Sequence, residues 1–477
     1  MKILLAASEF EPFASTGAFG ANVTALATEL AAQGHDVSVA LPFYRSVREN
    51  RSVKAKRTNV RFSVPVGAGR YSCEIREVRS KGVQVFFVER DEFFDRSGLY
   101  GTEDGDYQDN AARFIFFSKC VVELARRMDP EPEILQAHNW QAALVPVFAS
   151  HQRLPMRSVL VADSLDYQGN FWSYDFGLTN LPADLFSPRG LEYFGSMNLL
   201  KGGILFADRV ALPGSRFVSE AQTVEHGCGL DPVMREQTRK LEGIAHGLDV
   251  SSWNPANDAA LAKGYRSAQG KAQNRAAWLK EAAIEEGSMH LLVVTDAMMG
   301  DGMETLLPSI DRLLESGVRI AVLGKVEPSN VGEMEFAIRK HAGRFAWIPD
   351  SNEKTLRLAL AGSDVLLAPA PIRPDAFILR LALRYGVLPV PLQCGGLVQL
   401  APPFRVGEPS GLAFTFYRNT PDALVDAVRR ARSVHRDREV WSETVNRAMA
   451  LDFSWAATAH QFSMLYSSML ARGAMAA

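Results

Sequence analysis

Val293-Val294-Thr295-Asp296-Ala297-Met298-Met299-Gly300-Asp301-Gly302-Met303 is the stretch that decides the fold. It begins with apolar and β-branched residues, as a buried strand does, and glycine and aspartate residues then mark a loop that leads into a helix. A strand, a short loop and a helix are the repeating unit of a parallel α/β sheet. In such sheets ligands bind at the carboxyl ends of the strands, so this loop is a candidate binding loop.

The same alternation of short apolar runs and helical patterns extends through the chain and predicts two doubly wound parallel sheets. In the first half, strands are expected at residues 3–7, 37–41, 83–88, 134–137, 159–162 and 209–212, with helices at 22–33 and 110–127. In the second half, strands are expected at 291–295, 319–323, 345–347, 365–368 and 388–391, after a charged helical stretch at 258–286.

The turn-rich segment 246–255 separates the two halves, so two domains facing a cleft are predicted. The expected boundaries are 1–248 for the first domain, 249–451 for the second, and 452–477 for a C-terminal helix that packs back on the first. A chain of 477 residues is too long for one core and fits this division.

Composition excludes several classes of protein. The net charge of −2 gives no general attraction to nucleic acid or to an anionic membrane. The four cysteines form no CxxC pair, so neither a disulfide framework nor a zinc site is indicated. The apolar start of the chain is interrupted by Glu9 and Glu11, and there is no run of about 18 apolar residues. A cytoplasmic protein is the simplest interpretation.

Several segments together resemble one enzyme family. Ser8–Gly20 reads SEFEPFASTGAFG and resembles the opening S-E-x-x-P-x-x-K-T-G-G-L-G-D of the bacterial glycogen synthases and plant starch synthases. His138–Leu144 is similar to their H-D-W-H-A-A-L, and further motifs follow in the family's order, among them Tyr167-Gln168-Gly169, Gly395-Gly396-Leu397 and Phe453-Ser454-Trp455. The resemblance covers nearly the whole chain.

This resemblance implies the GT-B fold and transfer of glucose from ADP-glucose to an α-1,4-glucan. It also implies that the residues of the N-terminal motifs line the side of the cleft that binds the glucan acceptor. Aromatic rings stack on the apolar faces of sugars, and amides and carboxylates bond the hydroxyls. The expected acceptor-binding residues are Glu9, Tyr100, Asp106, Asn110, His138, Trp140, Tyr167 and Gln168. For His138 and Trp140 a purely structural packing role is the alternative.

The chain departs from the family pattern around the expected sugar-nucleotide donor. The family's lysine before Thr-Gly is Ser15, an acidic position is Ala21, and the histidine expected beside the reacting sugar is Asp163. An arginine and a lysine expected on the donor diphosphate are replaced by Asp296 and Asp301. A glutamate expected against the donor glucose is Arg373. No residue is therefore assigned with confidence as catalytic.

Reversing two charges in a donor site has a large electrostatic effect. Each contribution is about 4 kcal/mol at ~4 Å and an effective dielectric constant of about 20. The glycine turns at Gly17 and Gly20 and at Gly395 and Gly396 remain as anion-binding loops or as simple turns. A metal ion bridging Asp296, Asp301 and Asp163 is an alternative of low weight, and neither a metal nor another cofactor is expected.

Three functions remain open. The leading hypothesis is a family member with impaired or absent catalysis that binds glucan or regulates a catalytic homologue, with ADP-glucose disfavoured as a ligand. The first alternative is an active glycosyltransferase whose donor contacts are substituted. The second is a structural partner of another protein, for which neither ligand matters.

Overall fold

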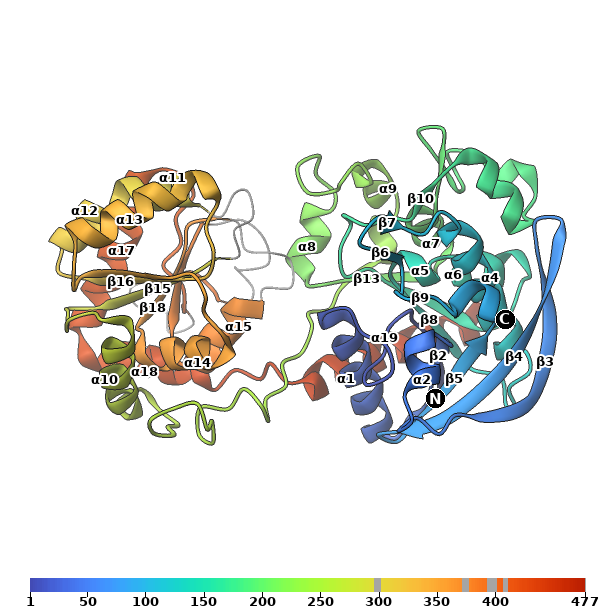
Figure 1. Ribbon diagram of the computed structural model, residues 1–477, viewed down its shortest axis with the longest axis horizontal. Coiled ribbons are helices and arrows are strands. Elements are labelled where there is room, and N and C mark those ends of the chain that lie inside the picture. Colours follow the sequence, from blue (N-terminus) through green and yellow to red (C-terminus); the bar gives the residue numbers. More distant parts are fainter. Residues whose placement is uncertain (296–301, 371–376, 393–400, 406–410, 477) are drawn as a thin grey trace. The chain divides into compact units, whose positions relative to one another are not determined.

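The computed structural model describes residues 1–295, 302–370, 377–392, 401–405 and 411–476. The chain folds into two compact units, shown in Figure 1. Unit 1 comprises Met1–Gly247 and Trp455–Ala477, and unit 2 comprises Leu248–Ser454. Each unit is built around a large, mainly parallel sheet, which confirms the predicted α/β class.

The sheet of unit 1 has nine strands in the order β14-β13-β9-β8-β1-β2-β5-β4-β3. The strands from β14 to β5 run parallel, and β4 and β3 are antiparallel additions at one edge. Their bounds are β1 Lys2–Ala6, β2 Asp36–Pro42, β3 Lys56–Val66, β4 Gly69–Ser80, β5 Val83–Glu89, β8 Ile134–His138, β9 Arg157–Val161, β13 Arg209–Leu212 and β14 Leu241–Gly243.

The six strands expected in the first half are confirmed as β1, β2, β5, β8, β9 and β13. The sequence did not predict the β3–β4 hairpin. Its strands carry many charged residues and bury only alternate positions, so no continuous apolar run marks them. Gly67 adopts a positive φ of 58° in the turn that joins them.

Helices and smaller elements complete unit 1. The longer helices are α1 Ala18–Ala32, α4 Asn110–Ala125, α6 Leu144–His151, α7 Leu199–Phe206 and α19 Trp455–Ala476. The short ones are α2 Arg45–Glu49, α3 Asp91–Phe94, α5 Asn139–Ala142, α8 Ser215–Glu220, α9 Asp231–Glu236, η1 Ser173–Thr179, η2 Ala183–Leu185 and η3 Thr238–Lys240. Two small antiparallel sheets are formed by β6 Gly101–Thr102 with β7 Gly105–Asp106, and by β10 Asn170–Phe171, β12 Ser196–Asn198 and β11 Glu192–Tyr193.

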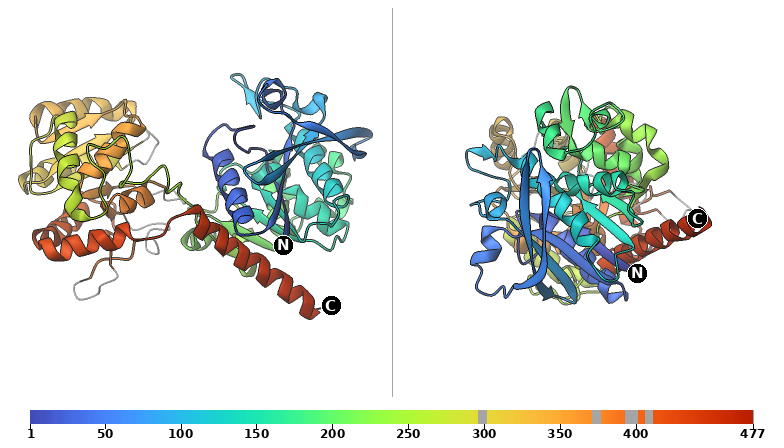
Figure 2. Two further views of the ribbon diagram at one scale, coloured as in Figure 1. Left: turned by 90° about the horizontal axis from the view of Figure 1, so that it is seen from below. Right: turned by 90° about the vertical axis from the view of Figure 1, so that its right-hand side faces the viewer.

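The C-terminal helix α19 belongs to unit 1, and Figure 2 shows it as the long red helix beside that unit's sheet. Gln33, at the end of α1, donates from Nε2 to the carbonyl of Ala456 at 2.9 Å. The Tyr466 hydroxyl donates to Gln136 Oε1 inside the core. These bonds, together with buried Phe462 and Leu465, fix α19 on the first unit although its sequence lies beyond the second.

Unit 2 contains a five-stranded parallel sheet in the order β17-β16-β15-β18-β19. The strands are β15 His290–Val294, β16 Arg319–Leu323, β17 Phe345–Ile348, β18 Val365–Ala368 and β19 Leu388–Pro391, as the sequence predicted. Alternate residues of a strand belong to separate cores: Leu291 and Val293 lie in one cluster and Leu292 in the other. Both faces of the sheet are therefore covered, as in a doubly wound fold.

The helical elements of unit 2 surround this sheet. They are α10 Ala272–Ala282, α11 Met303–Leu306, α12 Ile310–Glu315, α13 Val331–Lys340, α14 Glu353–Gly362, α15 Phe377–Arg384, α17 Pro421–Arg436 and α18 Arg438–Met449, with η4 Ala268–Lys271, η5 Leu307–Ser309 and η6 Pro328–Asn330. Within the residues described, no helix is long and apolar enough to cross a membrane.

The predicted helical stretch at 258–286 is correct only for α10, and the residues before η4 form turns and irregular backbone. Tertiary contacts of Asp258 explain this irregular backbone. The Asp258 carboxylate accepts hydrogen bonds from Arg357 at 3.0 Å and from Tyr385. A Cβ on Gly264 would lie 2.2 Å from the carbonyl of Ala256, so the chain also needs glycine in this compact turn.

Lys271 joins the ends of two helices of unit 2. Its buried Nζ lies 2.7 Å from the carbonyl of Ser363 and 3.4 Å from that of Leu360, at the end of α14. It lies 3.1 Å from the carbonyl of Tyr385 and 2.9 Å from that of Gly386, just after α15. Because carbonyls at helix C-termini lack partners within the helix and carry partial negative charge, the ammonium satisfies both ends at once.

Candidate functional site: a carboxylate–histidine pair at the carboxyl edge of the unit 1 sheet

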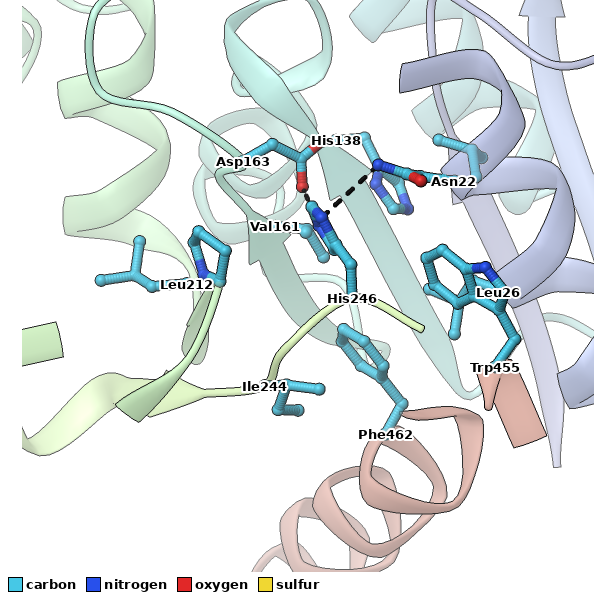
Figure 3. Close-up of a pocket in the computed structure, with 12 residues that line it drawn as sticks. Asn22, Leu26, His138, Val161, Asp163, Leu212, Ile244, His246, Trp455 and Phe462 are labelled. Carbon is cyan, nitrogen blue, oxygen red and sulfur yellow. Dashed lines mark hydrogen bonds and ion pairs between the residues drawn. The ribbon is translucent and has the colours of Figure 1, made fainter. Parts of the chain in front are cut away.

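The carboxyl edge of the unit 1 sheet brings Asp163 and His246 together, from strands β9 and β14 on either side of β13. Asp163 lies two residues after β9, and His246 lies three residues after β14. Asp163 Oδ1 and His246 Nε2 are 2.8 Å apart, although 83 residues separate them in the sequence. Figure 3 shows this contact, with His246 between Asp163 and Asn22.

Asn139 forms hydrogen bonds with the second carboxylate oxygen and the backbone N–H of Asp163. The Asn139 amide donates to Asp163 Oδ2 at 3.1 Å, and its carbonyl oxygen accepts from the Asp163 backbone N–H at 2.9 Å. Asn139 has a φ of 55°, a left-handed conformation that asparagine tolerates better than most residues. Burial raises the pKa of Asp163, but His246 and the hydrogen bond from Asn139 outweigh it and hold that pKa below its usual range. The side chain is thus a fixed carboxylate with both oxygens occupied.

The other side of His246 is closed by apolar and aromatic groups. His246 Nδ1 lies 3.4 Å from the Asn22 amide nitrogen, and the imidazole stacks on Trp455 with ring centroids 6.0 Å apart. The cavity that these residues line with Phe462 has a volume of about 20 Å³ (Figure 3). That volume accommodates a single water molecule.

His138, at the end of β8, lies behind this pair in the core. The Tyr466 hydroxyl donates to Gln136 Oε1, so the Gln136 amide NH₂ is directed to His138 Nε2 at 3.0 Å. His138 Nε2 therefore accepts, which places the imidazole proton on Nδ1. Burial lowers the pKa of His138 to about 4, against smaller opposing contributions from Asp163. The geometry is that of a neutral, hydrogen-bonded core histidine.

Acidification is expected to destabilise unit 1 through His138. Its folded pKa of about 4 lies below the unfolded value, so between pH 6.5 and 4 the unfolded chain binds the proton and the folded chain does not. The expected loss across that window is about 3 kcal/mol, at about 1.4 kcal/mol for each pKa unit. Urea unfolding at pH 7, 5.5 and 4.5 should show a shallower decline for His138→Gln, which keeps an acceptor but cannot titrate. Equal declines for both proteins would contradict this role.

Glu9 fixes the glycine-bearing turn through hydrogen bonds to Thr16. Its carboxylate, 2% exposed, accepts from the Thr16 N–H at 2.7 Å, the Thr16 hydroxyl at 2.8 Å and the Tyr100 hydroxyl at 2.7 Å. The Tyr100 oxygen in turn lies 2.7 Å from Ser8 Oγ, and burial raises the pKa of Tyr100 well above its usual value. The predicted residues Glu9 and Tyr100 are thus brought together, with their polar atoms bonded within the protein.

The turn itself carries no cation at the position expected for lysine. Ser15 is exposed, and its hydroxyl donates to the Gly17 carbonyl at 2.9 Å. A Cβ on Gly20 would lie 3.0 Å from the carbonyl of Ala14, so a side chain would be crowded there, whereas Gly17 is extended and has open space. Gly17 is the N-cap of α1 and makes no side-chain cap, which leaves first-turn amides available to an anion. Ala21 follows Gly20 in that first turn.

Asn110 and Trp140 have structural partners. Asn110 donates to the carbonyl of Tyr100 at 2.8 Å and accepts from buried Arg113 at 2.6 Å, which fixes the segment that carries Tyr100. Trp140 packs edge-on against Phe114 with centroids 5.0 Å apart. Asp106, in the β6–β7 hairpin, is exposed.

Tyr167 and Gln168 are neighbours with opposite environments. Tyr167 is 78% exposed, whereas Gln168 is buried and accepts from the Asn198 amide at 2.7 Å. Gln168 Nε2 also donates to the carbonyl of Cys228 at 2.9 Å. Of the eight expected acceptor-binding residues, Tyr167 and Asp106 are exposed, and the other six are packed or bonded inside unit 1.

The expected donor-side residues Asp296, Asp301, Arg373, Gly395 and Gly396 lie outside the described residues. The structure shows the elements around the first loop: β15 ends at Val294 and α11 begins at Met303. Among the described residues, no group of three His, Cys, Asp or Glu side chains is placed to hold a metal ion.

The sequence did not reveal the role of His246, which stands in a segment interpreted only as a turn between domains. A histidine beside glycine carries no pattern that points to Asp163. The pairing arises because parallel strands far apart in sequence end at the same edge of the sheet.

Comparison with known proteins places these features in a family. The family model "Starch synthase catalytic domain" matches residues 2–236. Glycogen synthase 2 of Geobacter sulfurreducens is 32% identical, with 98% of each chain covered, and glycogen synthase of Opitutus terrae is 34% identical, with 98% of this chain and 100% of that protein covered. The chain belongs to the glycogen and starch synthase family.

A solved structure agrees with this assignment. The catalytic domain of starch synthase IV from Arabidopsis thaliana, bound to ADP and acarbose, is 26% identical and matches with a TM-score of 0.76 over 98% of both chains. Sucrose-phosphate synthase from Thermosynechococcus elongatus, at 13% identity and a TM-score of 0.56, shares the fold. The predicted family and its GT-B fold are confirmed.

Proposed function

We propose that this family member binds an α-1,4-glucan and has lost efficient glucosyl transfer from ADP-glucose. One observation carries the proposal. Asp163 stands where the family resemblance expects a histidine beside the reacting sugar, and both its carboxylate oxygens are bonded, to His246 and Asn139. A fixed carboxylate has no proton to donate and offers a developing negative charge repulsion in place of stabilisation.

Charge around the expected donor supports the same conclusion. The hydroxyl of Ser15 replaces a cation at the turn before α1. The aspartates at 296 and 301 and Arg373 reverse three further charges. Transfer with ADP as the leaving group needs cations where negative charge grows on the diphosphate, so these changes act on the reaction's most demanding step.

Loss of transfer is tested directly with radiolabelled ADP-glucose and glycogen. We expect no incorporation of label above that of a heat-killed sample. Robust turnover would contradict the proposal and favour the alternative of an active transferase with substituted donor contacts.

Ligand-induced shifts of the melting temperature separate donor binding from acceptor binding. A ligand present at 100 times its Kd stabilises the fold by about 2.7 kcal/mol. We expect a shift with maltoheptaose and none with ADP, ADP-glucose or UDP-glucose. The variant Asp296→Arg, Asp301→Lys, Arg373→Glu should gain a shift with ADP. If no ligand shifts the wild-type protein, a structural role beside a catalytic homologue or another protein becomes the better function.

A further inference from the structure

Exposed aromatic side chains stand in the segments that follow two strands of the small sheet β10-β12-β11 of unit 1. Trp172 is 71% exposed, Tyr174 is 77% exposed and Phe194 is 88% exposed. Among the described residues of unit 1, the other large hydrophobic side chains with comparable exposure are Tyr167, Val224 and Met464. Soluble proteins seldom leave such groups together in water without a ligand for them.

Strand order places Trp172 and Tyr193 on either side of the central strand β12, Trp172 directly after β10 and Tyr193 in β11. Phe171 pairs with Met197, and Met197 is fully buried. Trp172 follows β10 directly, with φ −59° and ψ 145°, and is exposed. On the other side of β12, Tyr193 pairs with Ser196. The two residues therefore belong to the segments that flank β12.

Each of these flanking segments carries an edge-to-face aromatic pair. The rings of Trp172 and Tyr174 have centroids 4.9 Å apart at 70°, and those of Tyr193 and Phe194 have centroids 4.7 Å apart at 81°. Edge-to-face contact keeps each ring in place and leaves a ring face open to solvent. We name Trp172, Tyr174, Tyr193 and Phe194 the aromatic platform.

Phe194 adopts a conformation that the fold alone does not favour. It occupies the first position of the two-residue turn between β11 and β12 with a φ of 48°, followed by Gly195 with a φ of 78°. Two positive φ values define a type I′ turn, for which Asn-Gly is the preferred sequence and a bulky aromatic is a true outlier. Because the ring is also 88% exposed, burial does not compensate for the strained backbone.

We propose that the aromatic platform is a surface binding site for an α-glucan chain, separate from the Asp163–His246 site. The ligand class follows from the lining: flat rings suit the apolar faces of sugars, and the neighbouring polar groups are the Asn170 amide and the Ser173 and Ser196 hydroxyls. Exposed Tyr167, one of the expected acceptor-binding residues, lies three residues before β10. The proposal rests on the proposed glucan-binding function and assigns that binding to a new place.

Substitutions with opposite effects on binding and stability test the platform. Phe194→Asn introduces the preferred turn sequence, so it should raise the melting temperature while weakening glycogen binding. Trp172→Ala should weaken binding by about five- to tenfold, as expected for the loss of one stacking ring. Met464→Ala removes another exposed apolar side chain, 61% exposed, from α19 and should leave both properties unchanged. Binding is measured by retardation in native gels cast with glycogen and by titration calorimetry with maltoheptaose.

The possible outcomes separate the two proposals. Wild-type binding that survives in Trp172→Ala, Phe194→Asn and their combination would overturn the platform and leave glucan binding elsewhere intact. Absence of wild-type binding would overturn both. Robust transferase activity with platform-dependent binding would overturn only the loss of catalysis. A lower melting temperature for Phe194→Asn would show that the ring is structural. If the variants changed the sedimentation coefficient instead of glucan binding, the surface would be an interface between two copies of the chain, which would also refute the platform.

Discussion

Replacing Asp163 with alanine is expected to lower the free energy of unfolding by about 3 kcal/mol. The side chains of Asp163 and His246 are only 19% and 14% exposed, so each depends on the other for compensation. Removing the carboxylate also leaves the Asn139 amide and the His246 ring nitrogen without their acceptor. A buried polar group left without a hydrogen-bond partner destabilises the fold by its full desolvation penalty.

A double-mutant cycle in urea isolates this interaction. Asp163→Ala and His246→Ala should each be destabilising, and the double variant should be more stable than the sum of the two effects predicts. Asp166→Ala, an exposed acidic residue of the same loop, is the matched control and should change stability by less than about 0.5 kcal/mol. Additive effects of the two single changes would show that the interaction between Asp163 and His246 contributes nothing to stability. Asp163 would then be available to act on a substrate.

Lys271→Met is expected to destabilise unit 2 by about 4 kcal/mol or more. Methionine fills similar space but donates no hydrogen bond, so the carbonyls of Leu360, Ser363, Tyr385 and Gly386 lose a buried donor. Each buried unsatisfied group costs about 1–3 kcal/mol, and the Tyr385 carbonyl retains the Tyr265 hydroxyl at 2.8 Å as a donor. The effect should exceed that of most single substitutions.

The control for Lys271→Met is Lys280→Met, on the exposed face of α10, which we expect to leave the free energy of unfolding almost unchanged. Chemical unfolding followed by tryptophan fluorescence reports on unit 2 through Trp278, which is buried in the adjacent core. A stability of Lys271→Met within about 1 kcal/mol of the wild-type value would mean that water replaces the ammonium at these carbonyls.

Much of the fold was accessible from the sequence because local patterns specify it. Runs such as 291–295 and 37–41 are apolar over the length of a strand, and each is followed by turn residues and a helical pattern. The hairpin β3–β4 was not predicted because its strands lack a continuous apolar run. The irregular segment before η4 was mispredicted as helical because its conformation depends on partners distant in sequence, such as the contact of Asp258 with Arg357 and Tyr385.

The candidate site was predictable in part. The substitution of Asp163 for the family's histidine is visible in the motif before Tyr167, but its consequence is not. Only the structure shows that His246 and Asn139 occupy the carboxylate. The sequence also does not show that the adjacent residues Phe171 and Trp172 have different environments. Phe171 packs on Trp140 with centroids 5.7 Å apart, whereas Trp172 faces solvent.

The sequence by itself determined the family, the α/β class and the order of most strands and helices, because these depend on residue types and spacings along the chain. Tertiary structure alone decided which polar groups neutralise one another. Asp163 and His246 meet across 83 residues, Lys271 reaches carbonyls about 90 to 115 residues away, and Tyr466 reaches Gln136 from the far end of the chain. The physical reason is that charge compensation and burial depend on distance in space, and a periodic pattern records only which face of an element turns inward.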